Sequence, residues 1–213
     1  MKSKAVIFAG GTISGLEYIS LLNDVKFENI SIICVDKGVN YALENNINID
    51  IAIGDFDSVS KKSIDYLKNS DIKILNFNKD KDMTDMELAL DFCFKNNCKE
   101  VYLFGATGTR YDHSISNINL LKTYSLKGLK ISIIDENNYI FYINESTVIK
   151  KIDRKISILP TNEKCVFNLY GTKWELVNHN LKFGSSLTIS NEFYNDVNIE
   201  ILNGDMFVIL SKD

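Results

Sequence analysis

Short apolar runs alternate with longer helical stretches over the first 127 residues of the chain. Five of these runs are rich in β-branched or aromatic residues and are followed by Gly, Asp or Asn: AVIFA, ISIICV, IDIAI, IKIL and EVYLF. Strands that are apolar throughout are typical of sheets buried on both faces. Their alternation with helical stretches predicts a mostly parallel α/β sheet.

The clearest helix signal begins at Thr84. Thr84 and Glu87 form the S/T-x-x-E pattern of a capping box, in which each end of the pattern satisfies a backbone N–H of the first turn. The apolar positions that follow share one helical stripe: Leu88, Ala89, Phe92 and Cys93. We therefore expect Asp85 in the first turn of this helix.

After Gly128 the helical period fades and short alternating runs take over. They are LKISIID, YIFYIN, STVIKKI, KISILP, KCVFNLY, SLTIS, VNIEIL and DMFVIL. This pattern predicts an antiparallel β-sandwich. The fold class is thus α/β followed by all-β, with an α/β nucleotide-binding domain at 1–128 and a β-sandwich at 129–213. The boundary depends on the change of period alone.

Composition narrows the classes of partner. The 213 residues carry a net charge of −4, and the scattered lysines are joined by only two arginines, Arg110 and Arg154, which argues against nucleic acid. No run approaches the ~20 apolar residues of a membrane span. The cysteines lack zinc-site spacing and indicate reduced thiols of a cytoplasmic protein: Cys34, Cys93, Cys98 and Cys165.

Acidic residues cluster in the loops of the first half: Asp36, Asp55 with Asp57, Asp82 with Asp85, and Asp112. In an open parallel sheet the ligand site lies beyond the carboxyl ends of the strands. If residues 55–57 are extended, Asp55 and Asp57 face one side while Phe56 turns to the core. Paired carboxylates repel unless a cation joins them, and Mg²⁺ is held by one or two carboxylates plus substrate phosphates.

Purely structural roles remain open for these residues. Aspartates after strands also cap helices and form Asx-turns, and Asp112, just before a helical run, is a candidate N-cap. The segment FGATGTRYDH follows a strand and opens a helix, which suits phosphate binding, with Arg110 as a forked donor. Its alternative is a tight turn with an exposed arginine.

Four segments of the first half carry matching motifs: VDKGVNYAL, GDFDS, DKDMTDMELAL and GATGTRYDHSISNINLL. Together they resemble the thiamine pyrophosphokinase family, in which VDKGVNYAL is similar to A-D-G-G-A-N-x-L and GDFDS is the most specific match. DKDMTDMELAL resembles D-x-D-x-T-D-x-x-x-A-L, and GATGTRYDHSISNINLL resembles G-A-x-G-G-R-x-D-H-x-x-x-N-x-x-L-L. In the second half SILP, SLTISNEF and GDMFVILSKD also fit, so the resemblance extends over nearly the whole chain.

The resemblance implies a homodimer that transfers the diphosphoryl group of ATP to the thiamine hydroxyl, with Mg²⁺, at sites between the first domain of one subunit and the second of the other. It implies the following catalytic and metal-binding residues: Asp55, Asp57, Asp82 and Asp85. The nucleotide side would comprise Asp36, Gly105, Thr107, Arg110, Asp112 and His113. The thiamine pocket would comprise Ser190, Asn191 and Tyr194.

Two positions depart from the family pattern. Lys37 and Thr109 stand where the family has glycines, so either would be strained if its φ had to be positive. Two rival functions also stay open: a related pyrophosphokinase acting on another alcohol, such as a hydroxymethylpterin, and a nucleotide-binding module without catalysis. Release of AMP in the presence of thiamine separates the three.

Overall fold

The structure is a computed structural model that describes residues 1–13, 29–77 and 82–212. The chain forms two compact units, Met1–Glu136 and Asn137–Asp213. The boundary therefore lies after Glu136, and not after Gly128 as the sequence pattern indicated.

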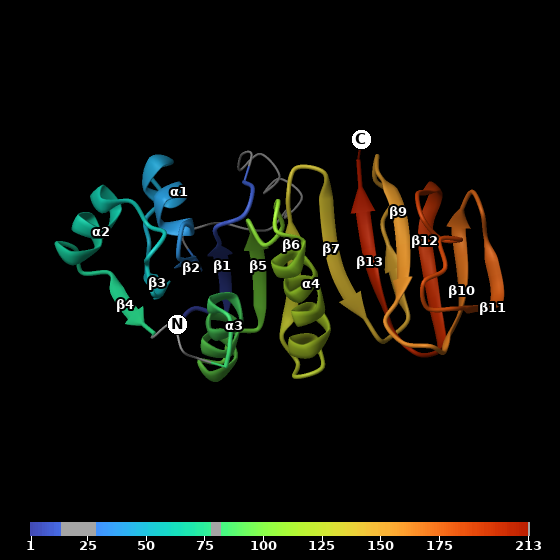
Figure 1. Cartoon of the computed structure of the whole chain (residues 1–213). Helices are drawn as coiled ribbons and strands as arrows, with labels where there is room; N and C mark the ends of the chain where they lie inside the picture. Colours follow the sequence, from blue (N-terminus) through green and yellow to red (C-terminus); the bar gives the residue numbers. More distant parts are fainter. Residues whose placement is uncertain (14–28, 78–81, 213) are drawn as a thin grey trace. The chain divides into compact units, whose positions relative to one another are not determined.

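The first unit is built on a parallel sheet (Figure 1). Its strands are β1 (Lys4–Phe8), β2 (Ile30–Val35), β3 (Ile51–Gly54), β4 (Lys73–Asn76), β5 (Glu100–Phe104) and β6 (Lys130–Ile134). They lie in the order β6-β5-β1-β2-β3-β4, and each of these neighbouring pairs is parallel. The predicted parallel α/β architecture is confirmed.

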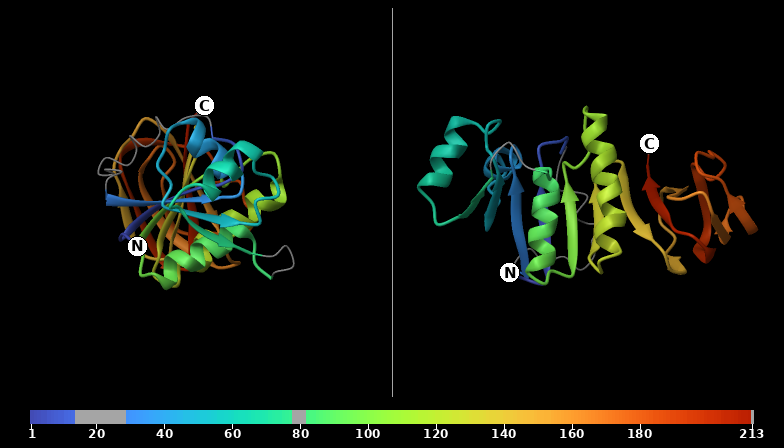
Figure 2. Two further views of the ribbon diagram at one scale, coloured as in Figure 1. Left: turned by 90° about the vertical axis from the view of Figure 1, so that its left-hand side faces the viewer. Right: turned by 60° about the horizontal axis from the view of Figure 1, so that its bottom comes forward.

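Among the described residues, four helices connect these strands: α1 (Gly38–Glu44), α2 (Lys61–Lys68), α3 (Asp85–Lys95) and α4 (Tyr111–Ser125). Thr84 caps α3, and its hydroxyl accepts a hydrogen bond from the Glu87 N–H at 3.2 Å, as predicted. Figures 1 and 2 show α3 and α4 side by side over one face of the sheet, and the two helices are in contact. Because the strands are parallel, every helix begins at the edge where the strands end.

Strand β6 explains the shift of the boundary. It pairs in parallel with β5, with Ile131 opposite Val101, and its last four residues are all buried. The change of period after Gly128 predicts that LKISIID belongs to the β-sandwich, yet Ser132, the polar residue within its apolar run, is itself buried. A buried serine gives a sheet-centre strand the appearance of an alternating one, so the period alone misplaced this strand.

The second unit is an antiparallel sandwich. Its strands are β7 (Asn138–Ile143), β8 (Thr147–Ile149), β9 (Lys155–Pro160), β10 (Cys165–Thr172), β11 (Leu176–Leu181), β12 (Asn191–Asn203) and β13 (Met206–Ser211). The order β7-β13-β9 continues into the start of β12, and the rest of β12 pairs with β8 and β10, which pairs with β11. Side chains from both layers form one core, including Ile158, Phe167 and Val208. The predicted sandwich is confirmed.

Two local predictions in this unit are wrong. Residues 186–190, expected as a strand, form a turn, in which the buried Thr188 donates its hydroxyl to the Ile158 carbonyl at 2.6 Å. The segment of β11, in which His179 lies opposite Phe167, is absent from the strands predicted from the sequence. β11 is an edge strand with mostly exposed or half-buried side chains, so its sequence LVNHNL lacks the apolar alternation that marks a strand.

Candidate functional site

Two glycine-rich loops meet where the chain reverses direction across the sheet. β1 lies between β2 and β5, so the connection from β4 to β5 makes this the topological switch point, where open α/β sheets bind ligands. The loop after β1 runs along the loop after β5, with hydrogen bonds from Gly11 N–H to Gly105 O and from Thr12 N–H to Thr107 O, both 2.9 Å. A Cβ on Gly11 would lie 2.2 Å from Thr107 O, so only glycine permits this approach.

Asp36 and the GDFDS segment also lie together. The Asp36 N–H donates to the Ile53 carbonyl at 3.1 Å, and a Cβ on Gly54 would lie only 2.0 Å from Asp36 Oδ1. Gly54 has φ +144°, which L-residues rarely adopt, and Asp36 itself has φ +45°. The backbone therefore places the half-buried Asp36 carboxylate directly over the start of this segment.

The residues between Asp55 and Asp57 are not extended. Phe56 has φ +60°, and Asp55 Oδ1 accepts a hydrogen bond from the Asp57 N–H at 3.0 Å, which is an Asx-turn. Phe56 is half-buried instead of reaching into the core, so the prediction of an extended segment is wrong. The turn still keeps both carboxylates beyond the end of β3, Asp55 half-buried and Asp57 exposed.

Asp82 and Asp85 lie at the same edge, because α3 begins where parallel strands end. Asp82 is exposed, and Asp85 is the half-buried first residue of α3. Among the residues that the structure describes, no three His, Cys, Asp or Glu side chains converge as a metal site would require. The carboxylate chemistry nevertheless suits Mg²⁺, which needs only one or two protein carboxylates when phosphates and water complete its shell.

The loop after β5 is braced by α4. Asn117 Nδ2 donates to the Ala106 carbonyl at 2.7 Å, and Ser114 Oγ accepts from the Gly108 N–H at 3.2 Å. Gly105 has φ +66°, and the Thr107 hydroxyl donates to Asp135 Oδ2 at 3.0 Å. The sequence reasoning missed Ser114, Asn117 and Asp135 as supports. Ser114 and Asn117 could have been found from their i, i+3 spacing, which places them on one face of the helix.

Arg110 and Asp112 form a forked pair at the start of α4, with Nε to Oδ1 at 3.2 Å and Nη2 to Oδ2 at 2.5 Å. This bond raises the pKa of Arg110 and lowers that of Asp112. Asp112 is the second helical residue and not the N-cap, which is Arg110. His113 follows it and is exposed.

The two departures from the glycine pattern cause no backbone strain. Lys37 has φ −58°, and the left-handed conformation falls on the preceding Asp36. Thr109 is not among the described residues with positive φ. Neither loop therefore needs a glycine at these two positions.

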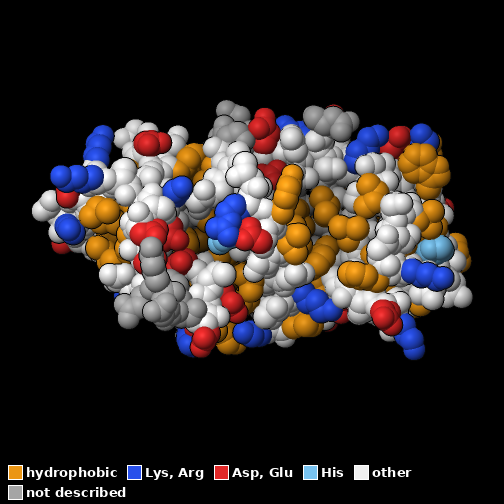
Figure 3. Space-filling view, viewed as in Figure 1, with side chains coloured by type: hydrophobic (Ala, Val, Ile, Leu, Met, Phe, Trp, Pro, Cys, Tyr) orange, Lys and Arg blue, Asp and Glu red, His pale blue; other side chains and the backbone are white. Residues whose placement is uncertain are grey.

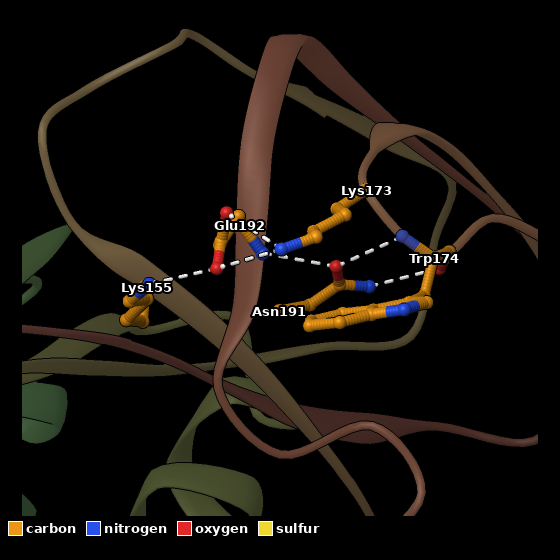
Figure 4. A network of polar contacts seen from close by, with 5 residues as sticks. All are labelled: Lys155, Lys173, Trp174, Asn191 and Glu192. Carbon is orange, nitrogen blue, oxygen red and sulfur yellow. Dashed lines mark hydrogen bonds and ion pairs between the residues drawn. The ribbon is translucent and has the colours of Figure 1, made fainter.

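In the second unit, Asn191 is a buried structural residue (Figure 4). Its Oδ1 accepts from the N–H groups of Trp174 and Glu192 at 3.2 and 2.9 Å, and its Nδ2 donates to Trp174 O and Thr172 Oγ1 at 2.8 and 3.1 Å. An amide side chain has two donor and two acceptor positions. All four are used within the chain, so Asn191 anchors the backbone of Trp174.

Trp174 is the residue that sequence reasoning missed here. Its side chain is 54% exposed, and the Lys173 ammonium lies 4.7 Å from the ring centroid. Glu192 pairs with Lys155 at 3.1 Å and with Lys173 at 3.4 Å (Figure 4), which lowers the pKa of Glu192. A single tryptophan, held by a polar network and open to solvent, suits an aromatic ligand.

The other predicted thiamine residues are exposed. Ser190 has φ +58°, and its N–H donates to Ser157 Oγ at 2.9 Å. Tyr194 is 57% exposed, and its carbonyl accepts from Lys151 Nζ at 2.9 Å. Beside them lies a cavity of about 740 Å³ lined by Lys151, Ile152, Asp153, Arg154, Lys155, Glu192, Phe193, Ser211 and Lys212.

The two units differ in surface character. On the face drawn in Figure 3, carboxylates gather over the first unit, and hydrophobic side chains are frequent over the second. Among the described residues each unit exposes eight large apolar side chains, so they are denser on the smaller second unit, where they are Val148, Trp174, Val177, Phe183, Leu187, Ile189, Tyr194 and Leu202. Within the described part of the chain, no helix is long and apolar enough to cross a membrane.

Comparison with known proteins agrees with both halves of the sequence. Residues 23–133 match the model of the thiamin pyrophosphokinase catalytic domain, and residues 144–204 match that of its vitamin B1 binding domain. The chain is 33% identical to the thiamine pyrophosphokinase of Bacillus subtilis over 184 residues, which is 84% of this chain and 86% of the relative.

Solved structures give the same result. The crystal structure of the Bacillus subtilis thiamine pyrophosphokinase is similar with a TM-score of 0.88 and 31% identity, covering 99% of each chain. That of the Geobacillus thermodenitrificans enzyme has a TM-score of 0.85 and 30% identity, covering 99% of this chain and 98% of the other. With matches over both units, the chain belongs to the thiamine pyrophosphokinase family.

Proposed function

We propose that this chain is a thiamine diphosphokinase, which transfers the diphosphoryl group of ATP to the hydroxyl of thiamine and releases AMP. One observation carries the proposal. The family's catalytic and vitamin B1 binding models match consecutive parts of the chain, 23–133 and 144–204. A nucleotide and thiamine would thus be recognised by different units.

The nucleotide would bind at the switch point of the first unit. Two glycine-containing loops are held together there by backbone hydrogen bonds, and α4 begins at the end of the second loop. Backbone N–H groups at such a helix start favour phosphate. The exposed Arg110 can exchange its bond with Asp112 for one with a phosphate oxygen. Gly105 and Thr107 lie in the same loop, and His113 follows it in α4.

The carboxylates after β2 and β3 and around the start of α3 would bind the transferred diphosphoryl group through a metal ion. Asp55 and Asp57, with Asp82 and Asp85, are the residues that would hold Mg²⁺ together with the ATP phosphates. A bound Mg²⁺ neutralises charge that develops on the phosphates during transfer. Asp36, fixed over Gly54, adds negative charge that attracts the thiazolium cation.

Thiamine would contact the second unit through Trp174. The exposed indole offers a π-face to an aromatic cation, and Asn191 holds the backbone of Trp174 in place. Asn191 thus acts as a positioning residue instead of a direct ligand, while Ser190 and Tyr194 present exposed side chains beside it. Because this is the only tryptophan, its fluorescence reports thiamine binding directly.

The chemical step requires placement more than covalent catalysis. The thiamine hydroxyl attacks the β-phosphorus of ATP in line with the departing AMP oxygen. One of the aspartates of the first unit, for example Asp85, half-buried at the start of α3, would accept the hydroxyl proton. Attack at the β-phosphorus predicts AMP, and not ADP, as the nucleotide product.

The test is a product assay on the purified chain with Mg-ATP and a panel of alcohols. We expect thiamine diphosphate and AMP in equal amounts with thiamine, and no AMP with a hydroxymethylpterin. ADP as the product would exclude diphosphoryl transfer. Nucleotide binding without AMP release from any alcohol would favour a module without catalysis.

The active unit would be a homodimer in which each site combines the carboxylates of one subunit with Trp174 of its partner. The exposed apolar side chains of the second unit support an interface there. In a two-fold dimer each contact occurs twice, so two equivalent sites form.

Complementation tests this arrangement. An Asp57→Asn subunit re-annealed with a Trp174→Ala subunit gives a heterodimer with one doubly altered and one intact site, so activity should return to about half of the wild-type value. Each variant re-annealed alone is the control and should stay inactive. If mass spectrometry verifies the heterodimers and they remain inactive, each site is built within one chain.

A further inference from the structure

The end of α3 brings two cysteines together. Asn97 has φ +59°, its N–H donates to the Phe94 carbonyl at 3.1 Å, and the Cys98 N–H donates to the Cys93 carbonyl at 3.0 Å. These two bonds define a Schellman motif, in which the side chains at the two ends of the longer bond come into contact. Here both of those positions are cysteine.

Two other helices of the first unit end in the same way. The matching long bonds run from Ile47 N–H to Ala42 O at 2.8 Å in α1, and from Leu129 N–H to Tyr124 O at 3.0 Å in α4. Each of those motifs joins an apolar pair, which is the usual content of these positions. The motif therefore forms without cysteine. The thiol pair at the end of α3 can in addition undergo redox chemistry, which an apolar pair cannot.

The two thiols interact directly beneath an exposed turn. Cys93 is fully buried and Cys98 is 4% exposed, whereas residues 94–97 are all exposed. A hydrogen bond between the thiols lowers the pKa of Cys98, and the same bond together with burial raises the pKa of Cys93. Cys98 Sγ also lies 3.3 Å from the carbonyl oxygens of Ser3 and Glu100, to which its thiol can donate. The bond from Cys93 favours the thiolate form of Cys98 over that of Cys93.

We propose that Cys93 and Cys98 are an oxidation site, which closes to an intramolecular disulfide in the presence of a hydroperoxide. The Cys98 thiolate attacks one peroxide oxygen, the O–O bond breaks, and Cys98 becomes a sulfenic acid while hydroxide leaves. Cys93 sulfur then attacks Cys98 sulfur, the S–O bond breaks, and the second hydroxide leaves with the thiol proton as water. In total, two thiols and one hydrogen peroxide give one disulfide and two waters.

The bond needs little backbone movement, because the motif already places the two side chains in contact. It would tie the end of α3 to the residues just before β5, and leave the start of α3 and the carboxyl edge of the sheet unchanged. Oxidised protein should therefore keep its activity and unfold at a higher temperature, by about 3 to 8 °C for a loop this short.

The experiment compares the fully reduced chain before and after treatment with hydrogen peroxide. Free thiols are blocked before digestion with trypsin, which cuts after Lys95, so the disulfide joins two peptides and is identified by mass spectrometry. We expect this linked pair, the loss of two free thiols, and reversal by dithiothreitol. Cys34→Ser and Cys165→Ser, at buried cysteines in β2 and β10, should retain the linked pair, whereas Cys98→Ser should abolish it.

Disulfide mapping of the wild-type protein tests the proposal even if one of the cysteine variants fails to fold. Folded protein whose Cys93 and Cys98 stay reduced, or which accumulates sulfinic acid at Cys98 without a linked peptide, overturns the proposal. A linked pair found only after unfolding in denaturant also overturns it, because the native motif would then not be what brings the sulfurs together.

Discussion

The two units build their candidate binding surfaces by different means. At the carboxyl edge of the first unit, backbone conformation places the functional groups: Asp36, Gly54, Phe56 and Gly105 all have positive φ. In the second unit, side-chain contacts place the groups. The Asn191 amide forms hydrogen bonds with the backbone of Trp174, and Glu192 forms ion pairs with Lys155 and Lys173.

The difference suits the two ligands that we propose. Phosphates and their cation need oxygen and N–H groups at fixed positions, which glycine-rich loops at strand ends supply. An aromatic cation needs an exposed π-face, and a large exposed ring keeps one orientation only if its backbone is fixed. Substitutions in the first unit should therefore affect chemistry more than stability, and substitutions around Asn191 should affect both.

The largest effect should come from Asp57→Asn. The exchange removes one negative charge with almost no change of volume, and the Asx-turn keeps its acceptor on Asp55. Loss of one carboxylate from a cation–phosphate clamp should lower kcat/KM roughly a hundredfold or more, with an unchanged melting temperature. Asp71→Asn, at an exposed loop position of the same unit, is the control. Near-normal turnover at saturating Mg²⁺ would make Asp57 a structural residue.

Asn191→Ala should act on stability and on thiamine binding together. It removes the partners of two Trp174 backbone groups and of the buried Thr172 hydroxyl, at a cost of roughly 2–3 kcal/mol in unfolding free energy. The emission of Trp174 should shift as its backbone loosens, and KM for thiamine should rise. Asn195→Ala, an exposed residue of the same strand, should change none of these. Unaltered emission with normal KM would show that Asn191 does not position Trp174.

The sequence revealed the first unit better than the second, because its signals are local. The Thr84 cap needs only residues three apart, and the aspartates and glycines of GDFDS and GATGTR adjoin apolar runs. The strand–helix alternation then implies that all these loops meet at one edge. The prediction of an extended backbone at residues 55–57 was wrong. Phe56 has a positive φ because it lies in a turn, and the alternation of apolar and polar residues does not predict turns of this kind.

In the second unit the decisive contacts join distant segments. Asn191 lies in β12, and its partners Thr172 and Trp174 lie at or after the end of β10. The residues next to Asn191 in the sequence therefore do not predict these hydrogen bonds. The sequence placed Asn191 in the thiamine pocket through the family resemblance, and only tertiary contacts show that its amide is saturated. β6 and β11 were predicted wrongly for a related reason. The residue pattern of a strand depends on how deeply the strand is buried in the sheet, and burial is not visible in the sequence period.

Gly54→Ala should sharpen the contrast by disturbing the backbone of the first unit alone. A Cβ would meet Asp36 Oδ1 at 2.0 Å in a conformation with φ +144°, which should cost about 2 kcal/mol and displace the Asp36 carboxylate. Gly128→Ala is the matched control, with φ +91° and no atom within 4 Å of the added Cβ. We expect both variants to melt earlier and only Gly54→Ala to lose activity. Equal activity losses would point to general destabilisation.

The smallest effect should come from Glu100, at the opposite edge of the same sheet. Its carboxylate pairs with Lys4 at 2.8 Å and Lys130 at 2.6 Å, joining the starts of β1, β5 and β6. Burial alone would raise the pKa of Glu100, but the bonds with Lys130 and Lys4 outweigh it and lower that pKa below its ordinary 4.5.

A lowered folded-state pKa means that the folded protein holds the Glu100 proton less tightly than the unfolded chain does. The stabilisation is therefore complete above about pH 5 and is lost as the pH falls through the lowered pKa. Glu100→Gln should cost less than about 1 kcal/mol at pH 7 and should flatten the fall in melting temperature between about pH 5 and pH 3. Glu44→Gln, exposed at the end of α1, should keep the wild-type profile. Because Glu100 lies far along the strands from the carboxyl edge, kcat/KM at neutral pH should stay unchanged, and a loss of activity here would mean that the two edges of the sheet are coupled.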